Sequence, residues 1–161
     1  AMYDLAIDFL ASAGFAQYEI SNFAQPGYAC RHNQGYWRNH PYIGIGPSAV
    51  AYWRGKRTTN LADIDQYTQR IEAGLDAWEQ YEKPGPDERA CETAVLNLRM
   101  CEGVDLTAFR HTTGVDFREV FATPLRHYEY HGLIEINDNR VHLTRKALAV
   151  ADSILCDFSS L

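Results

Sequence analysis

The first part of the chain changes from a helical to an extended pattern of apolar residues. Between residues 2 and 13, apolar side chains recur at spacings of three and four, which predicts an amphipathic helix that ends at Gly14. Residues 15–20 then have the pattern of a strand, followed by a turn at Ser21-Asn22. A helix, a glycine and a strand make half of an α/β repeat, and a single strand needs partners for its backbone. We therefore expect the end of an α/β domain.

The pattern then becomes irregular before a second helix is indicated. Residues 23–60 show little periodicity and are rich in glycine, proline and aromatic residues. Long unpatterned segments are usually functional or disordered, and the aromatic side chains argue for order. Apolar positions at helical spacing over residues 63–82 predict a helix, although Gly74 weakens it. The run KPGP at 83–86 is the clearest boundary in the chain.

Residues 86–161 have a pattern of their own. One long helix, two helices that begin at Asp105 and Asp116, a β-hairpin around residues 137–140 and a last helix from Thr144 follow in that order. This order predicts a winged-helix-like domain. Eight Lys and Arg against twelve Asp and Glu give the segment a net charge of −4, whereas DNA affinity depends on neutralising phosphates. We therefore expect a packing or partner-docking role rather than DNA binding.

Composition excludes several classes of protein. The 161 residues are 46% hydrophobic and 22% charged, which is ordinary for a globular protein. The net charge of −6 argues against a general nucleic-acid binder. No apolar run reaches the roughly 20 residues that a membrane helix needs, and the sequence does not open with a signal peptide. We therefore expect a cytoplasmic protein without a membrane span.

The cysteines do not suggest a metal site. Cys30, Cys91, Cys101 and Cys156 form no CxxC pair, which argues against zinc-ribbon and thioredoxin-like sites. Cys91 and Cys101 are expected on one helix, roughly 15 Å apart, too far for a disulfide or a shared metal ion. We expect reduced thiols, with Cys91, Cys101 and Cys156 acting as small buried apolar residues and Cys30 less so.

Charge is unevenly distributed along the chain. No acidic residue lies between Glu19 and Asp63, where the sequence instead has five lysines and arginines and two histidines. A basic segment with many aromatic residues favours an anionic small molecule that contains a ring system. The alternative is a solvated basic loop that docks onto an acidic neighbouring domain.

The candidate chemistry lies in two short strings of this segment. In HNQGYW at 32–37, a neutral His32 imidazole can ligate iron while Asn33 or Tyr36 orients it, although a structural histidine is the alternative. The string GIGPSAV at 44–50 is a glycine-rich turn that lets a ligand approach the backbone. It lacks the lysine and the full spacing of phosphate-binding loops. No pattern in the chain indicates a hydrolase.

Several strings together resemble a known family. They are YEISNFA at 18–24, HNQGYW at 32–37, YIGIGPSA at 42–49, and matching residues within 98–106, 132–134 and 143–154. Their order and spacing resemble the oxygen-independent coproporphyrinogen III oxidase family, and most closely its HemW-like branch of radical S-adenosylmethionine (SAM) proteins. The resemblance covers essentially the whole chain.

The resemblance implies an α+β fold in three parts. Residues 1–60 would be the end of a partial (β/α) barrel with a glycine- and aromatic-rich segment, residues 61–85 a linking helix and boundary, and residues 86–161 a mostly helical, winged-helix-like domain with a β-hairpin. It also implies a [4Fe-4S] cluster on a CxxxCxxC motif, with SAM on the open iron. That motif is absent from this sequence. We therefore expect a C-terminal part that by itself holds no cluster and has no radical activity.

The resemblance also implies site residues and two possible functions. Haem binding falls on His32, with Asn33, Tyr36 and Trp37 beside it, and Val50 would lie against SAM. One function is a chaperone that binds haem and passes it to a client protein. The other is an oxidase that decarboxylates the propionates of coproporphyrinogen III to give protoporphyrinogen IX. In both cases the ligand is a carboxylated tetrapyrrole, and the radical SAM core is a further partner.

Overall fold

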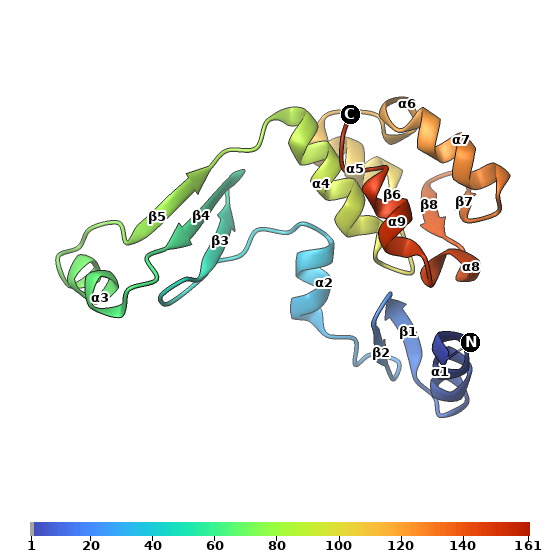
Figure 1. Ribbon diagram of the computed structural model, residues 1–161, viewed down its shortest axis with the longest axis horizontal. Helices are drawn as coiled ribbons and strands as arrows, with labels where there is room; N and C mark the ends of the chain where they lie inside the picture. The colour runs from blue at the N-terminus through green and yellow to red at the C-terminus, as the bar shows by residue number, and fades with distance from the viewer. Residues whose placement is uncertain (1) are drawn as a thin grey trace. The chain divides into compact units, whose positions relative to one another are not determined.

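The chain forms two compact units that each contain helices and strands. The structure, a computed structural model, describes residues 2–161. The first unit joins the chain up to Asn39 to the chain from Pro86, and the second unit is His40–Gly85. Figure 1 shows the elements of both units. The expected α+β class is confirmed, and the three-part domain division stays a prediction.

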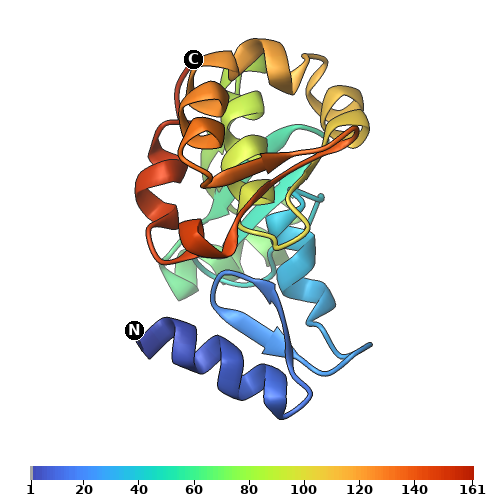
Figure 2. The ribbon, with the colours of Figure 1, turned by 90° about the vertical axis from the view of Figure 1, so that its right-hand side faces the viewer.

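The first unit begins with a helix beside a small antiparallel ribbon. These elements are α1 (Met2–Ser12), β1 (Ala16–Glu19) and β2 (Asn22–Ala24). Gly14 adopts a left-handed φ of +83°, so it ends the helix and turns the chain into β1, as the sequence predicts. The Tyr3 hydroxyl donates a hydrogen bond to the Ile20 carbonyl and so holds α1 against the end of the strand. Figure 2 shows α1 beside the ribbon of β1 and β2.

The second edge of β1 is bonded to a distant segment of the chain. The Ile20 N–H donates to the Arg99 carbonyl at 3.1 Å, and the Cys101 N–H donates to the Tyr18 carbonyl at 3.1 Å. The backbone groups of this strand therefore find partners on both sides. These partners, β2 and residues 99–101, are antiparallel and are not the parallel strands of an α/β repeat.

The rest of the first unit is winged-helix-like. After α2 (Arg31–Trp37) it contains α4 (Pro86–Leu98), β6 (Val104–Asp105), α5 (Leu106–Thr113), α6 (Phe117–Val120), α7 (Ala122–Tyr130), β7 (Ile134–Ile136), β8 (Arg140–Leu143), α8 (Arg145–Leu148) and α9 (Ala151–Cys156). The sheet order is β6-β8-β7, all antiparallel. The sequence correctly predicts the hairpin, but not the two-residue strand β6. The single last helix expected from Thr144 is wrong, because Val150 leaves the helical conformation (φ −124°, ψ 18°) and separates α8 from α9.

Two predicted helix starts in this part are confirmed, whereas the predicted length of one of these helices is wrong. The Asp105 carboxylate accepts the Ala108 N–H at 2.9 Å, and the Asp116 carboxylate accepts the Arg118 N–H at 2.9 Å, which caps α5 and α6 as predicted. The single helix expected from Asp116 to about residue 131 is wrong, because Phe121 leaves the helical conformation (φ −108°, ψ 26°) and separates α6 from α7.

A cluster of phenylalanines forms the centre of this unit. Phe109, Phe117, Phe121 and Phe158 are each at most 1% exposed. Their ring centres are 4.9 to 6.5 Å apart, in edge-on, tilted and stacked arrangements. Burying one such side chain contributes roughly 2 to 3 kcal/mol, so this cluster is a main source of stability for the unit.

The second unit is an antiparallel meander with one helix. It contains β3 (Val50–Trp53), β4 (Lys56–Asn60), α3 (Ile64–Glu72) and β5 (Trp78–Glu82), and the strand order is β3-β4-β5. The helix predicted over residues 63–82 is therefore correct only in its first half. Gly74 takes a left-handed φ of +68°, and the chain returns to pair with β4. Backbone pairing with a neighbouring strand overrides the helical spacing of Leu75 and Trp78.

Two further expectations concern cysteines and membranes. Cys101 follows the end of α4, so it does not share a helix with Cys91, and Cys156 is exposed rather than buried. Among residues 2–161, no helix is long and apolar enough to cross a membrane.

Candidate functional site

Helix α2 carries all four of the residues assigned to haem binding. His32 and Tyr36 lie one turn apart, and their rings meet edge-on with centres 4.7 Å apart. His32 is exposed and Tyr36 is 36% exposed, whereas Asn33 is half-buried. Residues four apart on a helix share a face. The structure thus presents an imidazole and a phenol together on one exposed side of α2.

Trp37 has a different role from its neighbours. Its ring lies beneath the Arg99 guanidinium, 4.7 Å from ring centre to Cζ, and its carbonyl accepts the Asn97 side-chain amide at 2.9 Å. Its Nε1 is buried and has no hydrogen-bond partner among residues 2–161. Trp37 therefore fixes the end of α2 to the end of α4, and cation–π attraction contributes to that contact.

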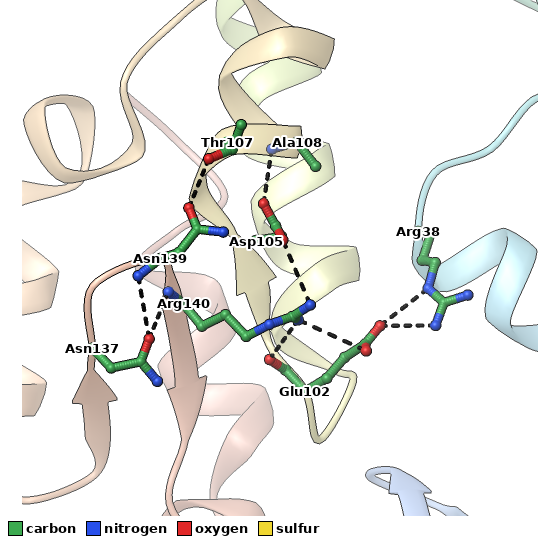
Figure 3. A network of polar contacts seen from close by, with 8 residues as sticks. All are labelled: Arg38, Glu102, Asp105, Thr107, Ala108, Asn137, Asn139 and Arg140. Carbon is green, nitrogen blue, oxygen red and sulfur yellow. Dashed lines mark hydrogen bonds and ion pairs between the residues drawn. The ribbon is translucent and has the colours of Figure 1, made fainter.

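Two residues that follow α2 strengthen this anchor. Arg38 donates from Nε and Nη2 to the Glu102 carboxylate at 3.1 and 2.9 Å. The buried Asn39 side chain donates to the Thr93 hydroxyl of α4 at 3.0 Å. Glu102 also lies 3.7 Å from the Arg140 guanidinium, so one carboxylate joins the chain after α2 to the hairpin strand β8 (Figure 3). The local sequence does not predict these partners, because they are 38 to 64 residues apart along the chain.

The glycine-rich turn lies in the second unit and has a fixed backbone. A Cβ on Gly44 would lie 2.2 Å from the Val50 carbonyl oxygen, so no larger residue fits there. The Gly46 N–H donates to the Tyr67 hydroxyl at 3.2 Å, and its carbonyl accepts the Asn60 side-chain amide at 2.9 Å. Val50, the first residue of β3, is 37% exposed beside this turn. The turn offers a rigid edge with an accessible apolar side chain.

Two of the five cations in the acid-free segment are paired with carboxylates. Arg38 is paired with Glu102, and Arg57 lies 3.5 Å from Glu82. Lys56 lies over the Tyr81 ring at 5.5 Å, and Arg54 over the Trp53 ring at 6.0 Å. The acidic partners come from later parts of the sequence. Folding therefore neutralises part of the charge that the sequence window shows.

The described residues also offer no site for an iron–sulfur cluster. Cys30, Cys91, Cys101 and Cys156 are all unpaired thiols. No group of three or more His, Cys, Asp or Glu side chains within residues 2–161 is arranged to hold a metal ion. The residues present therefore do not fit a [4Fe-4S] cluster.

Comparison with known proteins shows which class of domain this chain contains. Residues 85–150 match the family model of the HemN C-terminal domain. The fold is similar to coproporphyrinogen III oxidase (HemN) from Escherichia coli, described as a radical SAM enzyme, with a TM-score of 0.71 and 18% identity. That match covers 97% of this chain and 39% of the oxidase chain. The first unit thus contains a HemN-type C-terminal domain.

Curated relatives narrow the class to one branch. The chain is 37% identical over 118 residues to the heme chaperone HemW of Synechocystis. That alignment covers 72% of this chain and 29% of the relative. It is 31% identical over 158 residues to the heme chaperone HemW of Bacillus subtilis. This alignment covers 98% of the chain and 41% of the relative. The chain belongs to the family of HemW and HemN, as the resemblance implies. It spans less than half of the length of these relatives.

Proposed function

We propose that this chain is the C-terminal part of a radical SAM protein that binds haem and passes it to a client protein. Relatives that align along nearly the whole chain carry the name heme chaperone. The observation that carries the proposal is the exposed His32–Tyr36 pair on α2, with ring centres 4.7 Å apart. In the longer protein, the radical SAM core supplies the [4Fe-4S] cluster and SAM.

The residues of α2 have different roles in haem binding. His32 coordinates the haem iron through a ring nitrogen, because a neutral imidazole is an established haem ligand. Tyr36 packs at the edge of that imidazole and restricts its rotation, and the half-buried Asn33 supports the helix beside it. Trp37 does not touch the haem in this proposal. It holds α2 in place through Arg99 and Asn97.

Two further assignments belong to the same proposal. Val50 contacts SAM in the longer protein, because the neighbouring glycine turn is rigid and Val50 is accessible there. The protein acts in the cytoplasm, which suits four cysteines that form no disulfide.

Haem titration tests the role of His32. In the full-length protein, His32→Ala should weaken haem binding by about tenfold or more, because an axial ligand is lost. The change is measured as the haem absorption band during titration. His111→Ala is the matched control, since His111 is an exposed histidine on α5, and it should bind haem like the wild type. An unchanged titration for His32→Ala would remove this residue from the site.

The oxidase remains the second candidate, because the fold is also that of HemN. An oxidase would decarboxylate coproporphyrinogen III, and the full-length protein would then form protoporphyrinogen IX with repeated turnover. We expect no turnover. Sustained formation of protoporphyrinogen IX would overturn the chaperone proposal.

A further inference from the structure

Two histidines lie one turn apart at the C-terminal end of α7. His127 is in the last turn, and His131 is the residue that ends the helix. The His131 N–H donates to the His127 carbonyl at 3.3 Å, and His131 keeps a right-handed helical conformation (φ −83°, ψ −1°). Both side chains are exposed. Because residues four apart share a helix face, the two imidazoles occupy one surface patch.

The separation of the two rings matches that of a chelating pair. Their centres are 4.8 Å apart, and their planes are inclined by 65°. A metal ion about 2.1 Å from a ring nitrogen lies roughly 3.2 Å from the ring centre. Two imidazoles at 90° to 109° around one ion therefore have centres about 4.5 to 5.2 Å apart. The helix backbone already holds the two rings at this distance.

The electrostatic surroundings also favour a cation. The last carbonyl groups of a helix carry a partial negative charge, and the pair lies at that end of α7. The Asp157 carboxylate accepts a hydrogen bond from Tyr128, whose ring centre is 4.9 Å from that of His127.

We propose that His127 and His131 chelate one late first-row divalent metal ion, with water completing its coordination. Imidazole nitrogen is a favoured ligand for Ni²⁺, Cu²⁺ and Zn²⁺. No third His, Cys, Asp or Glu of residues 2–161 joins the pair in a metal-binding group, so most coordination positions stay open. The site uses neither haem nor α2, and it does not depend on the proposed haem function.

Calorimetric titration with Ni²⁺ alone tests this site on the untagged chain. The wild type should bind one Ni²⁺ ion at this pair. His127→Ala and His131→Ala should each weaken that binding by about tenfold or more, because the second imidazole of a chelate binds at high effective concentration. The losses in the two single variants should not add up in the double variant, because either change already destroys the chelate.

Two controls separate chelation from general binding to histidine. His111→Ala removes an exposed histidine on another helix and should leave the affinity unchanged. Glu129→His combined with His131→Ala keeps the number of histidines but moves the second one to a spacing of two, where helix side chains do not face each other. This variant should bind as weakly as His131→Ala. Wild-type affinity in it, or in either single alanine variant, would overturn the proposal.

Discussion

At the residue scale, the most unusual group is a buried carboxylate. Glu19 is 0% exposed, yet it has no ion-pair partner among residues 2–161. One of its oxygens accepts hydrogen bonds from the Ser21 N–H, at 2.8 Å, and from the Asn22 side-chain amide. The other oxygen has no hydrogen-bond partner among the described residues. This charge affects Cys101, which follows α4 and pairs with the same strand.

Cys101 should therefore be a slow nucleophile. Burial, and secondly the negative charge of Glu19, raise the pKa of Cys101 to about 11. A raised thiol pKa keeps the protonated form at neutral pH, so at pH 8 only about one thiol in a thousand is the reactive thiolate. Iodoacetamide labelling at pH 8 with mass spectrometry should modify the exposed Cys30 and Cys156 first.

A charge variant tests the cause of this shift. Glu19→Gln removes the negative charge and keeps an acceptor oxygen, so it should lower the pKa of Cys101 and speed its labelling. Labelling should still lag behind Cys30, because burial is the larger cause. Equal labelling rates for Cys101 and Cys30 in the folded wild type would contradict this account.

At the element scale, α2 is anchored at its C-terminal end. Its C-terminal end contacts Asn97 and Arg99, and the residues after it contact Glu102 and Thr93. Its N-terminal cap, Cys30, makes no side-chain capping hydrogen bond. The anchoring contacts lie at the C-terminal end of the helix. The exposed His32 and Tyr36 precede that end. Their position therefore depends on Trp37.

Removing the Trp37 ring should loosen the whole helix. Because Trp37 is only half-buried, Trp37→Ala should lower the free energy of unfolding by about 2 kcal/mol, below the 3 to 5 kcal/mol typical of fully buried aromatic residues. Hydrogen exchange of residues 31–38 should become faster.

Two variants of the same helix serve as controls. Trp37→Phe keeps a ring beneath Arg99 and removes the unpartnered Nε1, so its stability should stay within about 1 kcal/mol of the wild type. Gly35→Ala adds a Cβ that meets nothing within 4 Å, so it should stabilise α2 by about 0.5 to 1 kcal/mol. Unchanged exchange over residues 31–38 in Trp37→Ala would show that the ring is not the anchor.

At the scale of the whole molecule, the two units differ in how much core they bury. The first unit has an extensive buried cluster around its phenylalanines. In the second unit, Tyr52 and Ala77 are the buried apolar residues among those described, and Trp53, Trp78 and Tyr81 are between 40% and 52% exposed. Because burial of apolar surface is the main source of stability, the second unit should be the less stable of the two.

Hydrogen exchange measures this difference directly. Amides of β3, β4 and β5 should exchange through opening events of lower free energy than those of α4 and β8. Phe117→Ala should lower the stability of the first unit by about 3 to 5 kcal/mol, whereas Tyr52→Ala should affect exchange only within residues 40–85. Equal protection of both units would refute this ranking.

Features that depend on neighbouring residues were predicted correctly, and features that depend on residues far apart in the chain were missed. Gly14, Asp105 and Asp116 act on their own neighbours in the chain, and their turns and caps were predicted correctly. The strand at 78–82 was missed because its spacing also suits a helix, and pairing with β4 decides its conformation. The anchor of α2 was missed because Arg38 and Glu102 are 64 residues apart. The string at 32–37 was found, but not the burial that separates Trp37 from His32.

The sequence alone determined the helix boundaries at Gly14, Asp105 and Asp116, the β-hairpin and the membership of the HemW and HemN family, since local capping, turn chemistry and short strings of fixed spacing carry them. Only the tertiary structure decided which cations are paired, which residues of α2 are exposed and which hold it in place. These properties depend on groups from distant parts of the chain meeting in space, where distance, burial and charge set their chemistry.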